Sequence, residues 1–137
     1  LNPKGLPMAV HYQPDNYRAV NPYLLVSDGD RLLRFLREVF DAHQLALTRD
    51  PQGRMRHASV AIGDGTLMLG EPSGEWKPQP SSVYIYVPDV DAAYQRALAA
   101  GASSLYEPTT HDYGDRGCGV VDAEGNLWFI GTRVAGE

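Results

Sequence analysis

The hydrophobic and polar positions of the chain follow the same pattern twice, about sixty residues apart. An apolar stretch over residues 23–26 predicts a strand, and the matching stretch over residues 83–87 predicts a second one. Each is followed by an aspartate, Asp28 or Asp89, that can cap a helix with apolar residues every three or four positions. Further strand patterns follow in both copies, and acid–glycine turns ending at Gly65 and Gly125 lead into the last strands. Each copy therefore predicts the order β-α-β-β-β, and two such copies can pair to enclose a cleft.

The repeat divides the chain into two units joined by a short linker. The first unit covers about residues 17–71, with strands predicted near 45–48, 56–62 and 66–69 after its helix. Residues 72–81 contain prolines and a glycine, which favour a linker over a helix or strand. The second unit covers about residues 82–133, and its strands after the helix are predicted near 103–106, 116–121 and 127–130. We therefore predict an α+β fold in a single domain over residues 1–137.

Composition and charge narrow the class of protein. Of the 137 residues, 43% are hydrophobic and 21% are charged, which is typical of a folded soluble chain. The net charge of −5 argues against nucleic acid as a partner, and no apolar stretch approaches the roughly 18 residues of a membrane span. The single cysteine, Cys118, leaves no internal disulfide and favours a cytoplasmic location. Met8 is a candidate for the natural start, with residues 1–7 added before it.

Four short motifs occur in a fixed order along the two units. They are Asn21-Pro22-Tyr23-Leu24, Arg56-His57-Ala58, Tyr113-Gly114-Asp115-Arg116 and Asp122-Ala123-Glu124-Gly125-Asn126-Leu127-Trp128. With the doubled unit, this order resembles the vicinal oxygen chelate superfamily, which includes glyoxalase I, extradiol dioxygenases and bleomycin-resistance type binding proteins. The resemblance is closest to the small bacterial glyoxalase-like proteins and covers about residues 17–133. It implies a curved mixed sheet that encloses a cleft, helices on the outer face of that sheet, and a homodimer.

The resemblance also carries an expectation about metal. Catalytic members of that superfamily hold one divalent ion on four side chains, usually His or Gln, Glu, His and Glu, from the first and fourth strands of each unit. In this chain the resemblance places those positions on Asn21, on Ser82, on Met68 or Leu69, and on Trp128 or Phe129. Neither choice supplies the carboxylate or imidazole donors that such an ion prefers. The resemblance therefore implies no metal site and no other cofactor.

Strand alternation indicates which side chains face the cleft. Aliphatic residues at alternate positions of the two opening strands suit the helices, so the polar and aromatic residues between them face the other way. Tyrosines offer flat stacking surfaces together with hydrogen-bonding hydroxyls, as pockets for organic ligands do. The alternative is that these tyrosines fill the sheet face, with their hydroxyls reaching water. With the last strand included, the ligand-binding candidates are Asn21, Tyr23, Ser82, Tyr84, Tyr86 and Phe129.

The third strand adds His57 and Ser59, which share one face and are further ligand-binding candidates. His57 is also the candidate catalytic residue, because a pocket histidine can act as a general base near neutral pH. No carboxylate is identifiably placed to orient its ring. The favoured interpretation is therefore a partly buried histidine tied to a backbone carbonyl.

The remaining candidates lie in loops and turns. Tyr113 and Arg116 belong to the densest polar run and can rim the cleft, with the Arg116 guanidinium holding an anionic group. Alternatively, that run is a turn with a surface ion pair between Asp115 and Arg116. Trp76, in the linker, either covers the cleft or packs against the second chain of a dimer. The glycines beside Cys118 predict close approach of the backbone there rather than a reactive thiol.

The sequence is compatible with three functions. The first is a metal-free homodimer that binds a small planar or aromatic molecule in the cleft between its units. The second is a glyoxalase-like lyase or dioxygenase, either metal-independent with His57 as base or metallated through non-standard ligands such as Glu71 or Glu107. The third is a scaffold whose cleft is filled by side chains and whose dimer face alone matters.

Overall fold

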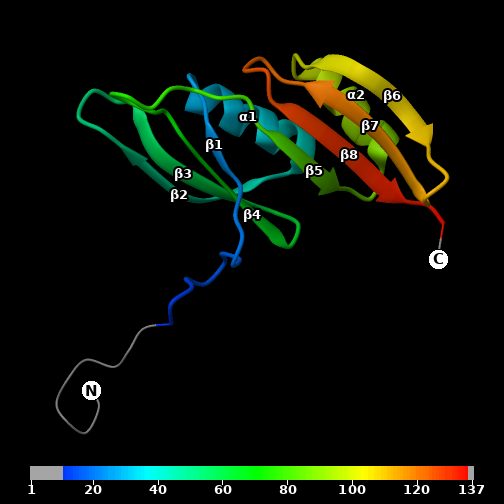
Figure 1. The fold of residues 1–137 in the computed structure, drawn as a ribbon, viewed down its shortest axis with the longest axis horizontal. Helices are drawn as coiled ribbons and strands as arrows, with labels where there is room; N and C mark the ends of the chain where they lie inside the picture. The colour runs from blue at the N-terminus through cyan, green and yellow to red at the C-terminus, as the bar shows by residue number, and fades with distance from the viewer. Residues whose placement is uncertain (1–10, 136–137) are drawn as a thin grey trace, which may run out of the picture.

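The computed structural model describes residues 11–135, and its elements follow the predicted order twice (Figure 1). The α+β fold with two tandem β-α-β-β-β units is therefore confirmed. Met8, the candidate for the natural start, lies outside the described residues. No helix within residues 11–135 is long and apolar enough to cross a bilayer. The elements are β1 (Tyr23–Leu25), α1 (Gly29–Phe40), β2 (His43–Arg49), β3 (Met55–Ile62), β4 (Gly65–Gly70), β5 (Ser82–Tyr86), α2 (Val90–Ala99), β6 (Ser103–Thr110), β7 (Asp115–Val121) and β8 (Leu127–Arg133).

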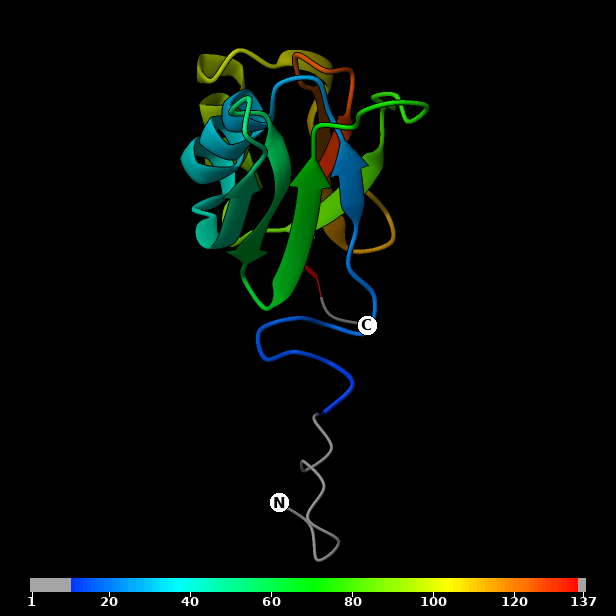
Figure 2. The same ribbon diagram turned by 90° about the vertical axis from the view of Figure 1, so that its left-hand side faces the viewer.

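The strands form two four-stranded sheets, one for each unit. The sheet of the first unit, sheet A, has the order β1-β4-β3-β2, and that of the second, sheet B, has the order β5-β8-β7-β6. In each sheet the opening strand runs parallel to the closing one, and the other pairs are antiparallel. Figures 1 and 2 show both helices on the same side of the two sheets. The opposite faces of the sheets are therefore available for a site.

Local chemistry sets the start of both helices and the end of α2 as predicted. Asp28 and Asp89 have extended backbones, and their carboxylates accept hydrogen bonds from backbone N–H groups three residues later. Gly101 follows the end of α2 with a positive φ of 100°, a conformation that favours glycine. Several strand boundaries differ from prediction, and two of the differences have a local explanation. The hairpin between β3 and β4 turns at Gly63 and Asp64, since Ile62 pairs with Gly65, and β6 continues through Pro108 because an edge strand tolerates the missing donor.

One hydrophobic core joins the two units. Trp128 of β8 is fully buried, and its ring lies 5.9 Å from that of Phe35 and 5.7 Å from that of Phe40, both on α1. The indole of the second unit therefore packs into the helix of the first. The guanidinium of Arg96 on α2 adds two hydrogen bonds to the carbonyl oxygen of Val39, at 3.0 and 3.1 Å, near the end of α1. These contacts fix how the two sheets lie relative to each other.

Two carboxylates stabilise the beginning of α1. Glu124, in the turn between β7 and β8, accepts hydrogen bonds from the backbone N–H groups of Ser27 and Asp28, the Ser27 hydroxyl and the Arg31 guanidinium. Burial raises the pKa of Glu124, but these donors outweigh it, so the pKa lies below its ordinary value. Glu71, at the end of sheet A, accepts from the backbone N–H groups of Gly29 and Met55. Both carboxylates lie where the helix dipole favours negative charge.

We predict that E124Q will weaken the junction between the units. Glutamine keeps the size of the side chain but loses the charge and one acceptor, so we expect a loss of about 2 kcal/mol in the free energy of unfolding near neutral pH. Because the pKa of Glu124 is lowered by folding, its contribution is present above the ordinary carboxyl pKa of 4.5 and is lost as the pH falls. Urea unfolding of both proteins at pH 7 and pH 3 measures this. Equal losses at the two pH values would contradict it.

Candidate functional site

The open face of sheet B presents aromatic side chains, as strand alternation predicts. Along β5, Val83 and Ile85 pack against the core, whereas Tyr84 is 44% exposed and Tyr86 is 63% exposed. The centroids of the two rings lie 5.0 Å apart. On the neighbouring strand, Phe129 pairs with Tyr84 in the sheet register. The rings are tilted by 48° to each other, so this face offers neighbouring aromatic surfaces on which a planar ligand can stack.

A buried carboxylate organises these tyrosines. Asp115, at the start of β7, is only 4% exposed, and its Oδ2 accepts hydrogen bonds from the Tyr84 hydroxyl at 2.9 Å and the Tyr86 hydroxyl at 2.6 Å. The hydrogen bond from Tyr86 is the main reason why the pKa of Asp115 lies below its ordinary value. Burial, followed by the bond to Asp115, raises the pKa of Tyr84, and the bond to Asp115 raises that of Tyr86. At neutral pH the carboxyl is therefore ionised and both phenols are neutral.

We predict that this cluster makes the fold sensitive to alkali. Because the pKa of Tyr84 is raised in the folded state, its contribution to stability is complete below the phenol's ordinary pKa of 10.0 and is lost as the pH rises through the folded-state value. Wild type should therefore lose stability more steeply above about pH 10 than Tyr84→Phe does. Thermal melts across this range, together with phenolate absorbance, measure the effect. Parallel stability curves for the two proteins would contradict it.

Glycines leave room on the sheet for the rings of Tyr84 and Tyr106. A Cβ atom at Gly131 would lie 2.3 Å from the Tyr84 hydroxyl, and one at Gly119 would lie 2.8 Å from the ring of Tyr106. The sequence predicted close approach of the backbone near Gly117 and Gly119; the backbone carbonyl oxygen of Ile130 does lie nearest to Gly117, whereas side chains approach Gly119. Cys118 between them is fully buried, and its burial raises the pKa of its thiol to about 11.

The turn after β6 adds two stacked rings to the same face. The rings of His111 and Tyr113 are 5.0 Å apart and nearly parallel, and the ring of Tyr106 meets His111 edge-on. The Nε2 atom of His111 is buried and has no hydrogen-bond partner among residues 11–135. A Cβ atom at Gly117 would lie 3.7 Å from both this nitrogen and the Tyr84 hydroxyl. Tyr113 is thus part of the aromatic face, although it lies at the end of the sheet away from β5.

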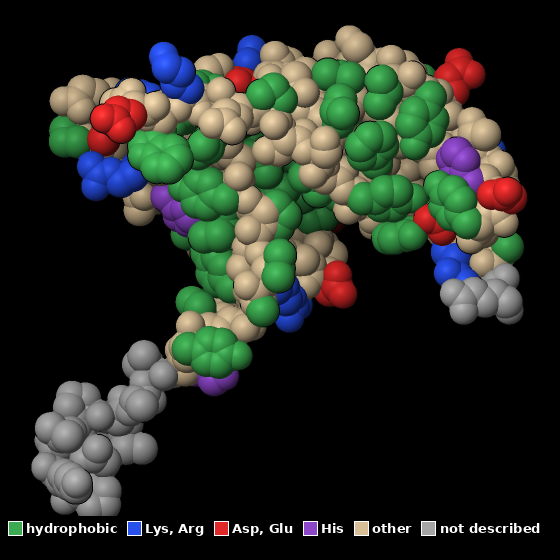
Figure 3. Space-filling model, viewed as in Figure 1, with side chains coloured by type: hydrophobic (Ala, Val, Ile, Leu, Met, Phe, Trp, Pro, Cys, Tyr) green, Lys and Arg blue, Asp and Glu red, His purple; other side chains and the backbone are tan. Residues whose placement is uncertain are grey.

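A cavity of about 300 Å³ separates the two units beside these tyrosines. Figure 3 shows the surface hollowed between the two halves of the molecule. One wall is β5, and the other comes from the segment before β1 and from the turn between β3 and β4, where the Arg18 guanidinium donates to the Asp64 carbonyl oxygen at 2.6 Å. The lining residues are Arg18, Val20, Pro22, Ile62, Gly63, Asp64, Gly65, Thr66, Leu67, Val83, Tyr84, Ile85 and Tyr86. We call this cavity the inter-unit cleft; sequence reasoning identified its β5 wall but missed the opposite one.

The predicted candidates on sheet A form a separate group. The Tyr23 hydroxyl lies 3.3 Å from Nδ1 of His57, and this is the only hydrogen bond of the His57 ring within the described residues. Ser59 is fully buried because the Tyr17 hydroxyl covers it at 2.6 Å. The Asn21 side chain bonds the backbone of Arg18 on both its oxygen and its nitrogen. His57 therefore has neither a carboxylate nor a backbone carbonyl to orient it.

Of three other candidates, Arg116 and Ser82 lie outside the cleft, and Trp76 does not cover it. Arg116 pairs with Asp91 of α2 at 2.8 Å, on the helix side of sheet B, because successive residues of β7 point to opposite faces. The alternative ion pair between Asp115 and Arg116 is likewise not formed. Trp76 is 71% exposed in the linker and lines none of the three cavities described here. Ser82 begins β5 with its side chain exposed and lies outside the cleft lining.

The strand register resolves which residues hold the superfamily's metal-ligand positions. Leu69 and Trp128 are fully buried in the core, so the positions on the open faces are Met68 and Phe129. Together with Asn21 and Ser82, these side chains do not fit a divalent ion. Glu71 is engaged at the start of α1, and Glu107 is exposed on β6. Within residues 11–135, no three His, Cys, Asp or Glu side chains are grouped so that they could hold a metal ion.

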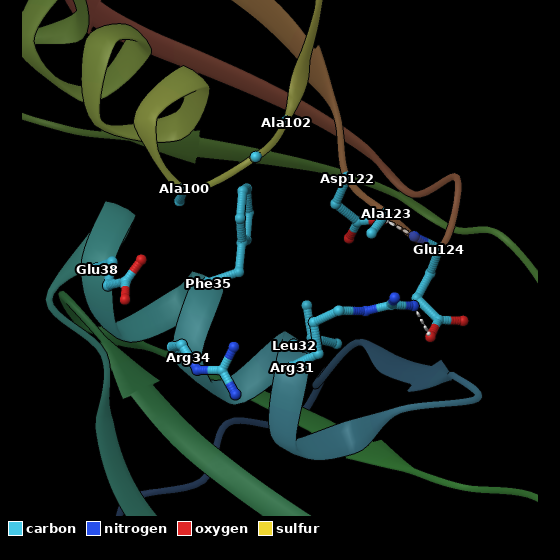
Figure 4. A pocket seen from close by; sticks show the side chains of 11 residues that line it. Arg31, Leu32, Arg34, Phe35, Glu38, Ala100, Ala102, Asp122, Ala123 and Glu124 are labelled. Atoms are coloured by element: carbon cyan, nitrogen blue, oxygen red, sulfur yellow. Dashed lines mark hydrogen bonds and ion pairs between the residues drawn. The ribbon is translucent and has the colours of Figure 1, made fainter.

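Two further cavities lie away from Tyr84 and Tyr86. One, of about 250 Å³, lies on the helix side between α1 and the β7–β8 turn. Figure 4 shows Phe35 pointing into it, with Arg31 turned toward Glu124. The other, of about 470 Å³, lies between residues 12–19 and sheet A and reaches Asn21 and Met68. Neither is lined by Tyr84, Tyr86 or Asp115.

Comparison with known proteins gives the family of this fold and site. Residues 11–130 match the model of the Glyoxalase/Bleomycin resistance protein/Dioxygenase superfamily. The chain belongs to this superfamily. An uncharacterised protein of Mycobacterium tuberculosis strain H37Rv is 32% identical over 142 residues, covering 96% of this chain and 81% of the relative. An uncharacterised protein of Mycobacterium bovis is 33% identical over 138 residues, covering 93% and 88%.

Solved structures share the fold of this chain. TioX from Micromonospora sp. ML1 is 30% identical to this chain and superposes with a TM-score of 0.69. The match covers 85% of this chain and 100% of TioX. The fosfomycin resistance protein FosX from Listeria monocytogenes, complexed with Mn(II) and sulfate, is 15% identical and superposes with a TM-score of 0.65. This match covers 84% of this chain and 89% of FosX. At that identity the second likeness concerns the fold alone. The fold predicted for this superfamily from the motifs is thus confirmed.

Proposed function

We propose that this superfamily member binds a small planar aromatic molecule in the inter-unit cleft, without metal chemistry. The observation that carries the proposal is the aromatic face of sheet B, where Tyr84 lies over Gly131 and both Tyr84 and Tyr86 are held by the buried Asp115. Such an arrangement is pre-organised, because the rings need not be ordered when a ligand arrives. The adjoining cavity of about 300 Å³ is of the size that small ligands occupy.

The chemistry of the cleft favours binding over catalysis. The bond from Tyr84 to Asp115 and the raised pKa of both phenols keep these groups neutral, so they are poor general bases at pH 7. His57 lies on the other sheet and bonds to Tyr23 rather than to a carboxylate. The positions that hold metal in catalytic superfamily members carry amide, hydroxyl, thioether and phenyl groups here. A lyase or dioxygenase therefore lacks an identifiable reacting group in the cleft.

We further propose that the protein is a cytoplasmic homodimer. Large apolar side chains on the segment before β1 and in the linker are exposed, with Tyr12 86% exposed, Val20 83% and Trp76 71%. A second chain that covers them would remove this apolar surface from water. Sedimentation equilibrium tests the pairing, and a single species with the mass of one chain would contradict it.

Metal content and thermal stability test the metal-free mode. Protein purified without chelator should contain no stoichiometric nickel, zinc, manganese or iron, and these ions should leave its melting temperature unchanged. A planar aromatic probe such as indole should raise the melting temperature by mass action in the presence of chelator. One tightly bound ion per chain would overturn the proposal in favour of a metal-dependent lyase or dioxygenase. A protein stabilised by neither ions nor aromatic probes would favour the scaffold function.

A further inference from the structure

The hydrogen bonds of Asp115 determine what the tyrosine hydroxyls can offer a ligand. A phenol has one proton to donate and lone pairs to accept with. Tyr84 and Tyr86 both donate their proton to Oδ2 of Asp115, at 2.9 and 2.6 Å. The carboxylate has no proton to return while it is ionised. Both hydroxyls therefore present only acceptor lone pairs to a ligand that lies on the aromatic face of sheet B.

The surroundings of Asp115 hold it in the ionised form. The hydrogen bonds from Tyr86 and Tyr84 lower the pKa of Asp115 and outweigh its burial, which raises it. The charge of Arg133, which pairs with Asp115 in the register of β7 and β8, lowers it further. A carboxylate held this way stays an acceptor across the physiological pH range. The direction of both tyrosine bonds is thus fixed by electrostatics and not only by geometry.

We infer that the ligand carries an N–H or O–H donor on its planar ring system and directs it at the Tyr84 and Tyr86 hydroxyls. This inference rests on the proposed function and narrows its ligand class to indole-like, phenolic or arylamine molecules. A ring system that carries only hydrogen-bond acceptors cannot bond to these hydroxyls, because both phenol protons are already donated to Asp115. The donor of the ligand completes a chain from ring to phenol to carboxylate, in which each bond polarises the next.

Two bicyclic probes of the same shape test the inference. Indole has a ring N–H, whereas benzofuran has an oxygen at that position and no donor. In ¹H–¹⁵N NMR titrations of the full chain, we expect both probes to shift the amides of β5, β7 and β8. Indole should bind roughly three- to tenfold more tightly, which is the effect of one net hydrogen bond. Equal affinities, or tighter binding of benzofuran, would overturn the inference.

Variants of Asp115 and of the tyrosines provide a second test of the inference. In Asp115→Asn the amide nitrogen donates to one phenol, which frees that phenol's proton for a ligand acceptor, so the preference for indole should disappear. Tyr86→Phe, at an exposed position, should reduce the preference even if the asparagine variant does not fold. Tyr94→Phe, which removes a hydroxyl bonded to Ser104 on the helix side, should keep the wild-type preference. An unchanged preference in Tyr86→Phe and Asp115→Asn would contradict the assignment to these hydroxyls.

The experiment separates failure of the inference from failure of the proposed function. If both probes shift the sheet B amides equally, the cleft binds aromatic molecules but does not select donors. If neither probe shifts those amides, the proposed function itself is wrong.

Discussion

Asp122→Ala should destabilise the protein more than E124Q does. Asp122 is buried in the β7–β8 turn, where Oδ1 accepts from the backbone N–H groups of Glu124 and Asn126, and Oδ2 accepts from the Asn126 amide and the Trp128 indole, all at 2.8 to 2.9 Å. Alanine leaves these four donors without their acceptor. Since Asn126 and Trp128 are themselves buried, we expect the free energy of unfolding to fall by about 4 kcal/mol.

Urea unfolding followed by circular dichroism measures this loss. Asp112→Ala, at an exposed position in the turn before β7, serves as the matched control and should change stability by less than about 0.5 kcal/mol. Asp122 also positions the turn that carries Glu124, so D122A and E124Q should be less than additive in the double variant. A loss below about 1 kcal/mol for D122A would show that the turn is held by other contacts.

Gly131→Ala should disrupt the aromatic face without removing any aromatic ring. The new Cβ would lie 2.3 Å from the Tyr84 hydroxyl and 3.0 Å from its ring carbon Cζ, so the phenol must move and lose its bond to Asp115. We expect affinity for indole to fall at least about tenfold, which corresponds to the lost hydrogen bond and the displaced stacking surface. The pKa of Tyr84 should also return toward its ordinary value.

Gly117→Ala is the control for this change, because Gly117 pairs with Gly131 in the sheet. The nearest atom to its added Cβ is a carbonyl oxygen at 3.3 Å, and the Tyr84 hydroxyl is 3.7 Å away, so the phenol can stay in place. Isothermal titration with indole and phenolate absorbance compare the two variants. Wild-type affinity and an unchanged Tyr84 titration in G131A would mean that the phenol position is irrelevant to binding.

Features set by local sequence were predictable. The caps at Asp28 and Asp89 depend on residues within one turn, and the facing of Val83 and Tyr84 depends on strand alternation alone. Both could be inferred without knowing which strands are neighbours. The acid–glycine turn at Gly65 was misplaced by one residue, because either dipeptide, Gly63-Asp64 or Asp64-Gly65, suits a two-residue hairpin.

Features set by distant contacts could not be predicted. Asp115 bonds tyrosines of β5 across the intervening β8, and Arg116 bonds a carboxylate on α2, so neither partner is a sequence neighbour. Ser59 was expected in the cleft, yet the path of the segment before β1 brings Tyr17 over it. That segment also forms the second wall of the inter-unit cleft. The hydrophobic pattern gives no information on such paths, since the segment has no regular periodicity.

The cleft beside Tyr84 and Tyr86 is proposed to bind a planar aromatic molecule without metal. The most direct test is a ¹H–¹⁵N NMR titration of the chelator-treated protein with indole. We expect saturable shifts at the amides of Tyr84, Asp115 and Gly131, unchanged when chelator is replaced by zinc or manganese. Shifts confined to the helix-side cavity around Phe35, or binding that appears only with added metal, would contradict the claim.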